Sequence, residues 1–171
     1  MTGGQTGLAE LRTVAAYQFG SGAGAALFPS GESLSIERSR SGRPRQVKAS
    51  AGRIVSVTTQ GRFTLGIEGG RRLHRGLPEA YHVAVNAESE SYVREGHNAF
   101  AKFVRGVDPA VRPGDEVRVT SEAGALLGVG RAELSAIAAR EFETGMAVSV
   151  REGAGKGGDE RGSSGQGVSD A

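Results

Sequence analysis

Apolar residues recur at helical spacing near the start of the chain and at alternating or clustered positions over most of the remaining sequence. The first pattern predicts a helix over residues 8–19, and its apolar positions are Leu8, Leu11, Val14, Ala15 and Phe19. Strands are expected at residues 34–38, 53–59, 62–67 and 82–86, with a short helix from Gly69 to about Gly76. A few antiparallel strands with two helices are typical of a small α+β domain, here residues 8–87.

The second half of the chain is richer in strand signals. Strands are predicted at 91–93, 100–104, 116–120, 126–132 and 147–151, and a helix at 135–144 with Ser135 as its cap. These elements are assigned to a second domain over residues 88–153. The Gly-rich segments 1–7 and 154–171 are expected to be disordered tails.

Composition narrows the classes of function. With 171 residues the chain is too short for a (β/α)8 enzyme barrel, which needs about 250. Cysteine is absent, which fits a reducing cytoplasm. No apolar run approaches the roughly 20 residues of a membrane span, and no secretory signal is evident. We therefore expect a cytoplasmic protein without membrane contact.

The net charge of +2 is unevenly distributed. Residues 8–87 hold 11 Lys+Arg against 5 Asp+Glu, a balance of +6, whereas residues 88–153 hold 8 against 11, a balance of −3. The most basic stretch contains Arg38, Arg40, Arg43 and Arg45, interrupted by glycine and proline, so these arginines are expected on a loop or strand edge. Guanidinium groups in such a loop can bind phosphate oxygens, although a merely solubilising loop is the alternative.

No catalytic or metal-binding pattern is evident in the sequence. His74, His82 and His97 have no short metal-ligand spacing, and no cysteine supplements them. Asp115 and Glu116 are adjacent, but neighbouring strand residues point to opposite faces, so they do not suit an acid–base pair, and Asp115 is expected to be a turn former. We expect no catalytic centre, no metal and no cofactor.

Four motifs follow one another in the second half. They are Arg-Glu-Gly-His-Asn-Ala-Phe-Ala-Lys-Phe-Val at 94–104, Val-Arg-Pro-Gly-Asp-Glu-Val-Arg-Val at 111–119, Ala-Leu-Leu-Gly-Val-Gly-Arg-Ala at 125–132 and Gly-Met-Ala-Val-Ser-Val-Arg at 145–151. Their order resembles a PUA domain, a small RNA-binding pseudo-barrel. The segment Tyr-Gln-Phe-Gly at 17–20, the Ser-Gly-Arg-Pro-Arg-Gln run at 41–46 and the stretch 63–69 resemble the domain that precedes PUA in archaeal tRNA-guanine transglycosylase, the archaeosine transglycosylase.

The resemblance implies an RNA-facing surface in the second domain. Matched onto this sequence, it comprises Arg94, Gly96, His97, Asn98, Phe100, Lys102 and Arg151. Phe100 and Phe103 are nevertheless expected to be core residues. Because this half is acidic, the basic stretch 38–45 and the pair Arg71-Arg72 are expected to supply long-range attraction to RNA.

The resulting hypothesis is an RNA-binding protein linked to tRNA modification, binding tRNA at the acceptor stem and 3′ end as the resemblance implies. It would act alone or as the non-catalytic subunit of a split tRNA-guanine transglycosylase whose catalytic barrel is a separate chain. The acidic balance of the second domain favours an alternative, a protein-interaction or ribosome-associated adaptor that has lost its RNA contacts. An enzyme with an unrecognised site is a third possibility.

Overall fold

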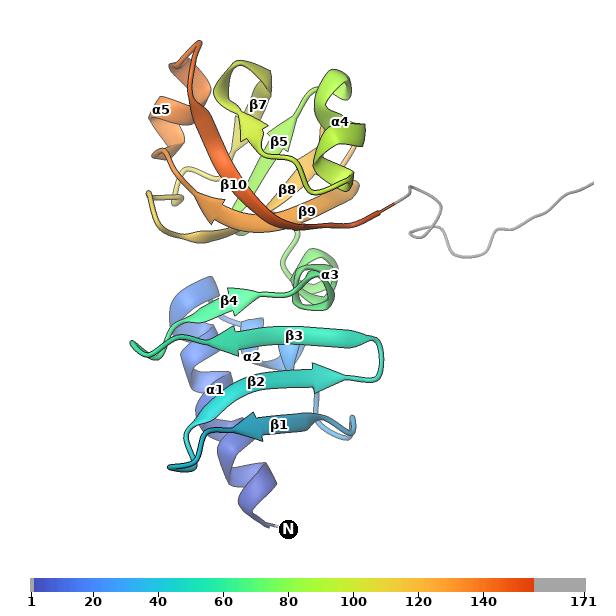
Figure 1. Cartoon of the computed structure of the whole chain (residues 1–171), viewed down its shortest axis with the longest axis vertical. Helices are drawn as coiled ribbons and strands as arrows, with labels where there is room; N and C mark the ends of the chain where they lie inside the picture. Colours follow the sequence, from blue (N-terminus) through green and yellow to red (C-terminus); the bar gives the residue numbers. More distant parts are fainter. Residues whose placement is uncertain (1, 156–171) are drawn as a thin grey trace, which may run out of the picture.

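Two sheets stack along the long axis of the molecule in the computed structural model, which describes residues 2–155, with side chains from residue 7 onward (Figure 1). The first domain contains α1 (Thr2–Phe19), α2 (Ala23–Leu27), β1 (Ser35–Arg38), β2 (Pro44–Ala49), β3 (Gly52–Val57), β4 (Phe63–Leu65) and α3 (Ile67–Gly76). The second contains β5 (His82–Val85), α4 (Ala87–Arg94), β6 (Ala99–Phe100), the 3-10 turn η1 (Ala101–Phe103), β7 (Val104–Val107), β8 (Glu116–Ser121), β9 (Leu126–Ala132), α5 (Ala136–Glu141) and β10 (Met146–Gly153).

Helix α1 packs against the antiparallel sheet β1-β2-β3-β4. Leu11, Ala15 and Phe19, one turn apart, are buried in the first core, as the helical spacing predicts. The helix starts at Thr2, inside the segment 1–7 that was expected to be a disordered tail, while Met1 lies outside the described residues. The glycine-rich connector after Phe19 also contains an unexpected helix, α2, whose Ala23 and Leu27 are buried.

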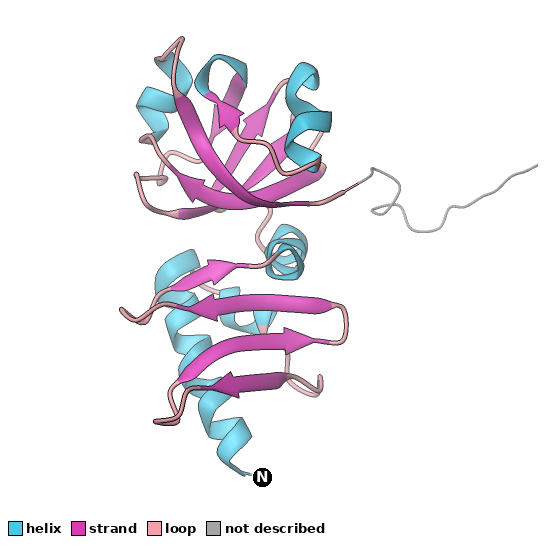
Figure 2. Ribbon diagram, viewed as in Figure 1, coloured by secondary structure: helices cyan, strands magenta, loops and turns pink. Residues whose placement is uncertain are grey.

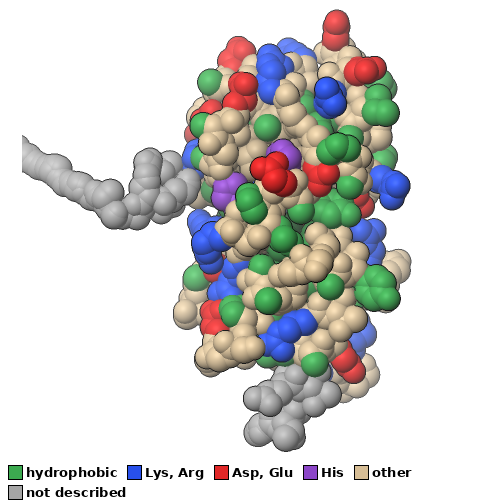
Figure 3. All heavy atoms as spheres, turned by 180° about the vertical axis from the view of Figure 1, so that it is seen from behind, with side chains coloured by type: hydrophobic (Ala, Val, Ile, Leu, Met, Phe, Trp, Pro, Cys, Tyr) green, Lys and Arg blue, Asp and Glu red, His purple; other side chains and the backbone are tan. Residues whose placement is uncertain are grey.

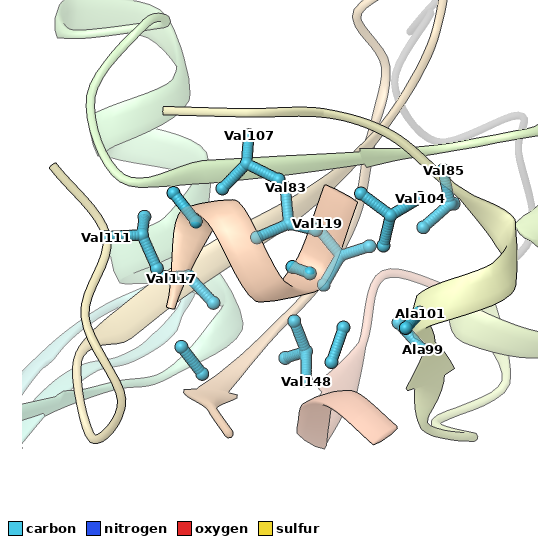
Figure 4. Packing of buried hydrophobic residues seen from close by; sticks show 14 of the residues in the cluster. Val83, Val85, Ala99, Ala101, Val104, Val107, Val111, Val117, Val119 and Val148 are labelled. Atoms are coloured by element: carbon cyan, nitrogen blue, oxygen red, sulfur yellow. The ribbon is translucent and has the colours of Figure 1, made fainter. Parts of the chain in front are cut away.

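The second sheet has the strand order β6-β10-β9-β8-β5-β7 and curls into a nearly closed barrel. All its pairings are antiparallel except β5 with β8. Its core is built mainly of valines from several strands (Figure 4). The α+β class and the pseudo-barrel are thus confirmed. Of the tail expected at 154–171, only Ala154 and Gly155 are described.

Two expectations for this region were wrong. The strand at 82–86 was assigned to the first domain, but β5 hydrogen-bonds to β7 and β8, so the barrel begins earlier than residue 88. Residues 91–93, expected to form a strand, belong to helix α4 instead. The Asn86 side chain accepts from the Ser89 amide, and glutamates occupy the first turn, which together favour a helix start.

The two domains meet through α3 and the outer face of the barrel, and Figure 2 shows α3 between the two sheets. Strand β8 alternates in character, as predicted, yet all six of its residues are buried. Val117 and Val119 face the barrel core, while Glu116 and Arg118 make hydrogen bonds to residues of the first domain and the segment joining the two. The polar face of β8 therefore serves the domain interface rather than solvent.

Candidate functional site

Arg72, which was expected to attract RNA, is buried. Only 7% of it is exposed, and its guanidinium makes a two-pronged pair with Glu32 at 2.7 Å and a 2.8 Å bond to Glu68. It also donates to the Leu27 carbonyl. The prediction of an RNA-binding Arg72 is therefore corrected: each of its three guanidinium nitrogens donates to a group inside the fold. Arg71 keeps a third of its side chain exposed and lies 3.8 Å from Glu68.

Arg151 is exposed, as an RNA-facing residue would be, and it also spans the domain interface. It lies 2.6 Å from Glu116 Oε2 and donates to the Leu65 carbonyl at 2.8 Å. Glu116 Oε1 in turn accepts from the Leu65 amide. The pair thus binds both backbone groups of one residue on the edge strand β4. The sequence places a cation at the end of the last strand but does not reveal that its partner is buried.

Arg118 was not anticipated by sequence reasoning. It is 1% exposed and donates to the carbonyls of Leu77, Pro78 and Ala80, which fix the segment joining the two domains. Burial lowers the pKa of Arg118 to about 10. Its other terminal nitrogen bonds His74 Nδ1 at 2.7 Å. The alternation of β8 was a signal that this side chain shares a face with Glu116.

The four arginines of the basic stretch lie at the β1–β2 turn and are exposed. Arg38 donates to the Gly42 carbonyl and Arg43 weakly to the Thr58 carbonyl. None of these four arginines, Arg40 and Arg45 included, forms a salt bridge with another residue of the described chain. The turn therefore presents cations whose charge the fold leaves uncompensated.

Contacts extend this basic turn toward the second domain. Arg43 reaches Thr58 at the β3–β4 turn, where Arg62 donates through its amide to Thr58 Oγ1. Arg62 lies 3.7 Å from Asp115, which accepts from the Arg112 amide. The β1–β2 and β3–β4 turns point to the same side, left in Figure 1. We name this line the arginine edge; its members are Arg38, Arg40, Arg43, Arg45, Arg62 and Arg112.

Sequence reasoning missed Arg62 and Arg112 as parts of the edge. Each is exposed and lies in or next to a glycine turn, after Gly61 and before Gly114. A cation beside a predicted turn was the available signal. What the sequence could not provide is that turns from both domains converge on one side. Asp115, expected to be a turn former, does accept from the backbone of its own turn.

A second group of predicted residues lies around the turn after α4. Gly96 has φ +99°, a conformation that favours glycine, and His97 beside it is exposed, 3.9 Å from Glu95. Arg94 donates to the Gly155 carbonyl. Asn98 departs from expectation: its side-chain oxygen accepts from the Val150 amide, so it joins two segments of the barrel. We call Arg94, Gly96, His97 and Lys102 the PUA turn surface.

Phe100 is 43% exposed, so the expectation that it is a core residue was wrong, and Phe103 is only partly buried. Together with Lys102 and Glu143 they line a hollow of about 440 Å³. Lys102 Nζ lies 5.1 Å from the centre of the Phe103 ring. Lys102 is exposed and lies in η1, which interrupts the strand pattern at this point.

The two domains differ in their balance of acidic and basic side chains. On the face shown in Figure 3, acidic side chains gather over the second domain, and basic ones occur on both. Within residues 2–155, no cluster of three His, Asp or Glu side chains is arranged to hold a metal ion. The helices of that same part of the chain include none long and apolar enough to cross a membrane.

Comparisons with known families divide the chain where the structure does. Residues 9–80 match the family model described as the patch-forming domain C2 of tRNA-guanine transglycosylase, and residues 81–154 match the PUA domain. The junction coincides with the segment held by Arg118, directly before β5.

Curated relatives and solved structures extend this result. A tRNA-guanine(15) transglycosylase of Pyrococcus furiosus is 43% identical over 145 residues, 84% of this chain and 24% of the relative. The same-named protein of Methanothermobacter thermautotrophicus is 41% identical over 149 residues, 85% of this chain and 22% of the relative. The chain thus spans about a quarter of the length of these relatives.

The fold is also found in a hypothetical protein from Pyrococcus horikoshii OT3, with TM-score 0.64 and 17% identity over 91% of this chain and 95% of that one. A conserved PUA domain protein from Thermoplasma acidophilum aligns with TM-score 0.52 and 22% identity, covering 77% of this chain and 83% of that one.

Proposed function

The chain combines the patch-forming domain C2 of tRNA-guanine transglycosylase with a PUA domain, and on this premise we propose that it binds RNA, specifically tRNA, through the arginine edge and the PUA turn surface. The relatives named tRNA-guanine(15) transglycosylase support a role in tRNA modification. Binding would take place in the cytoplasm.

The observation that carries the proposal is the uncompensated charge of the β1–β2 turn within the arginine edge. Arg40 and Arg45 are exposed, and no described carboxylate forms a salt bridge with either. Several guanidinium groups held near one another repel unless an anion lies between them, and each can bind a phosphate through two nitrogens. Some arginines elsewhere in the fold are paired closely with carboxylates, as Arg72 and Arg151 are, and the arginines of the β1–β2 turn differ from these.

The PUA turn surface supplies the second contact. Gly96 allows the backbone to approach a ligand closely, and the exposed His97 and Lys102 can reach phosphates or base edges. Because the second domain is acidic overall, we assign it recognition of RNA shape, at the acceptor stem and 3′ end as in the transglycosylase resemblance. The arginine edge supplies most of the electrostatic attraction.

The part of the relatives that this chain matches is about a quarter of their length. We therefore propose a binding role without a catalytic centre, either in a protein acting alone or in the RNA-binding subunit of a split transglycosylase. Affinity purification from the source cells distinguishes the two, since a co-purifying chain of barrel size supports the subunit. Recovery of the chain with tRNA alone supports independent action.

Binding of labelled tRNA, measured by fluorescence anisotropy, tests the proposal. We expect the native chain to bind tRNA more tightly than a double-stranded RNA of equal length. The double variant R40Q/R45Q should weaken tRNA binding, whereas R131Q/R140Q, which removes the same charge from exposed sites of the second domain, should not. Equal weakening by both variants, or no tRNA binding by the native chain, would contradict the proposal.

The acidic balance of the second domain favours one other candidate, a protein-interaction adaptor. An adaptor would bind neither tRNA nor the duplex control at physiological salt. The same titration therefore separates the two functions.

A further inference from the structure

The segment from Tyr17 to Gly20 contains three residues with evident structural roles. Phe19 is buried in the first core, and Gly20, with φ +109°, ends α1. The Gln18 side chain donates to the Phe63 carbonyl and accepts from the Phe63 amide, both at 2.8 Å, which ties α1 to β4. Tyr17, by contrast, is 89% exposed. A ring so exposed is accessible to a ligand, and its surroundings decide whether it can bind one.

Tyr17 borders a hollow of about 420 Å³ between the domains. Its walls come from α1, from the β3–β4 turn through Gly61 and Arg62, and from the second domain through Tyr81 and Arg112. Figure 1 shows α1 ending beside the β3–β4 turn. A hollow of this volume lies within the usual range for small-ligand sites.

The hollow combines an aromatic ring with two cations of the arginine edge. Arg62 is 53% exposed, and its 3.7 Å pairing with Asp115 is long enough to be exchanged for a phosphate at small cost. Arg112 is exposed and has no salt bridge in the described chain. Asp115 also accepts from the Arg112 amide, and this hydrogen bond does not depend on Arg62.

The wall formed by Tyr81 is held in an unusual conformation. Tyr81 has φ +50°, alone among the non-glycine residues described. Its ring meets Phe19 edge to face at 6.1 Å, and its amide is bonded by Asp108. Such backbone strain persists only where surrounding contacts impose it, and it is common at ligand sites.

We propose that this hollow seats one unpaired nucleotide of the bound RNA, with its base stacked on the Tyr17 ring and its phosphate between Arg62 and Arg112. This inference rests on the proposed function and adds a site to it. A base within an A-form duplex is covered by its neighbours, so a side-chain ring can stack only on a base outside the duplex. Any base can stack on tyrosine, because each base has a π-face. The site therefore distinguishes unpaired from paired nucleotides but does not read the sequence.

The test compares two RNA probes, a blunt hairpin and the same hairpin with a four-nucleotide single-stranded extension. The native chain should bind the extended probe more tightly. Tyr17→Ala should lower the affinity for the extended probe about tenfold, which is in the range for one base–aromatic stack. The affinity for the blunt probe should not change. Tyr17→Phe should retain the preference, because the ring rather than the hydroxyl makes the stack. Phe142→Ala, which removes another exposed ring, should change neither probe.

The result that would overturn the proposal is a Tyr17→Ala variant that keeps the full preference for the extended probe or loses both probes equally. A direct readout on the native chain excludes misfolding as the cause. The chain has three tyrosines, so their ring signals are resolvable by NMR, and Tyr17 should shift on addition of a single-stranded tetranucleotide. An unshifted Tyr17 contradicts the site. If neither probe binds the native chain, the proposed function fails together with the site. If both bind equally, only the site fails.

Discussion

Arg151 and Glu116 form a 2.6 Å ion pair that binds both backbone groups of Leu65. Glu116 accepts from the Leu65 amide and Arg151 donates to its carbonyl. The edge strand of the first domain is thereby joined to the last strand of the second. The two domains should consequently unfold as one cooperative unit.

Glu116→Ala should reveal this coupling. The change leaves a buried amide and a half-buried guanidinium without their acceptor, and we expect a loss of about 2–4 kcal/mol in the free energy of unfolding. Urea denaturation followed by circular dichroism measures it. Glu133→Ala, which breaks the exposed pair with Arg131, is the matched control and should cost less than about 1 kcal/mol. Equal losses would mean that the Leu65 contact adds nothing.

Arg72→Met should destabilise the first domain. Methionine fills much of the same space but leaves the carboxylate of Glu68, itself buried, with only the longer 3.8 Å contact to Arg71. Breaking a buried pair in this way costs about 3–5 kcal/mol. The double variant Arg72→Met, Glu68→Leu should recover part of the loss, and its thermal unfolding beside the single variant measures how much. Absence of any recovery would show that Glu68 does not carry the penalty.

Glu32 should make the stability of the fold depend on pH. The hydrogen bond from Arg72 lowers the pKa of Glu32 below its ordinary value of 4.5. A carboxylate with a depressed pKa stabilises the fold above pH 4.5 and loses that contribution as the pH falls toward the folded-state pKa. Glu32→Gln should therefore be less stable than the native chain at pH 7, and the gap should narrow at pH 3. A gap independent of pH in urea titrations would show that the charge of Glu32 is unimportant.

Gly70→Ala should disturb the domain interface. A Cβ at Gly70 would lie 2.4 Å from Cγ1 of Val129 on the barrel, so the Val129 side chain or helix α3 must shift. Destabilisation of about 1–3 kcal/mol is expected, with a changed solution scattering profile. Gly106→Ala is the control, since its Cβ would meet Ala84 at an ordinary 3.8 Å. If the scattering profiles of both variants match that of the native chain, the packing of α3 against the barrel does not set the position of the two domains.

Periodicity in the sequence was sufficient for most elements of the fold. The spacing of Leu11, Ala15 and Phe19 gave the first helix, and alternation gave most strands. It failed at α4, where Tyr92 and Val93 favour a strand by residue type. The cap at Asn86 and the acidic first turn outweigh that preference, because they satisfy amides that a helix start leaves open.

The candidate site was predictable only in part. A basic turn is visible in the sequence, and the exposure of Arg40 and Arg45 agrees with it. Arg72 and Arg151 could not be separated from these, because the partner that neutralises an arginine is brought to it by the tertiary fold, as Glu32 and Glu116 are. The same reason hid Arg62 and Arg112, whose turns come from different domains.

Neutralisation of RNA phosphates by the arginine edge is the central claim, and the salt dependence of tRNA affinity measures it most directly. The logarithm of the association constant falls linearly with the logarithm of salt concentration, by about 0.7–0.9 for each phosphate contact. Removing the Arg40 and Arg45 charges should weaken binding and make the slope shallower by about 1.4–1.8, while R131Q/R140Q keeps the native slope. A native slope in R40Q/R45Q would contradict the claim.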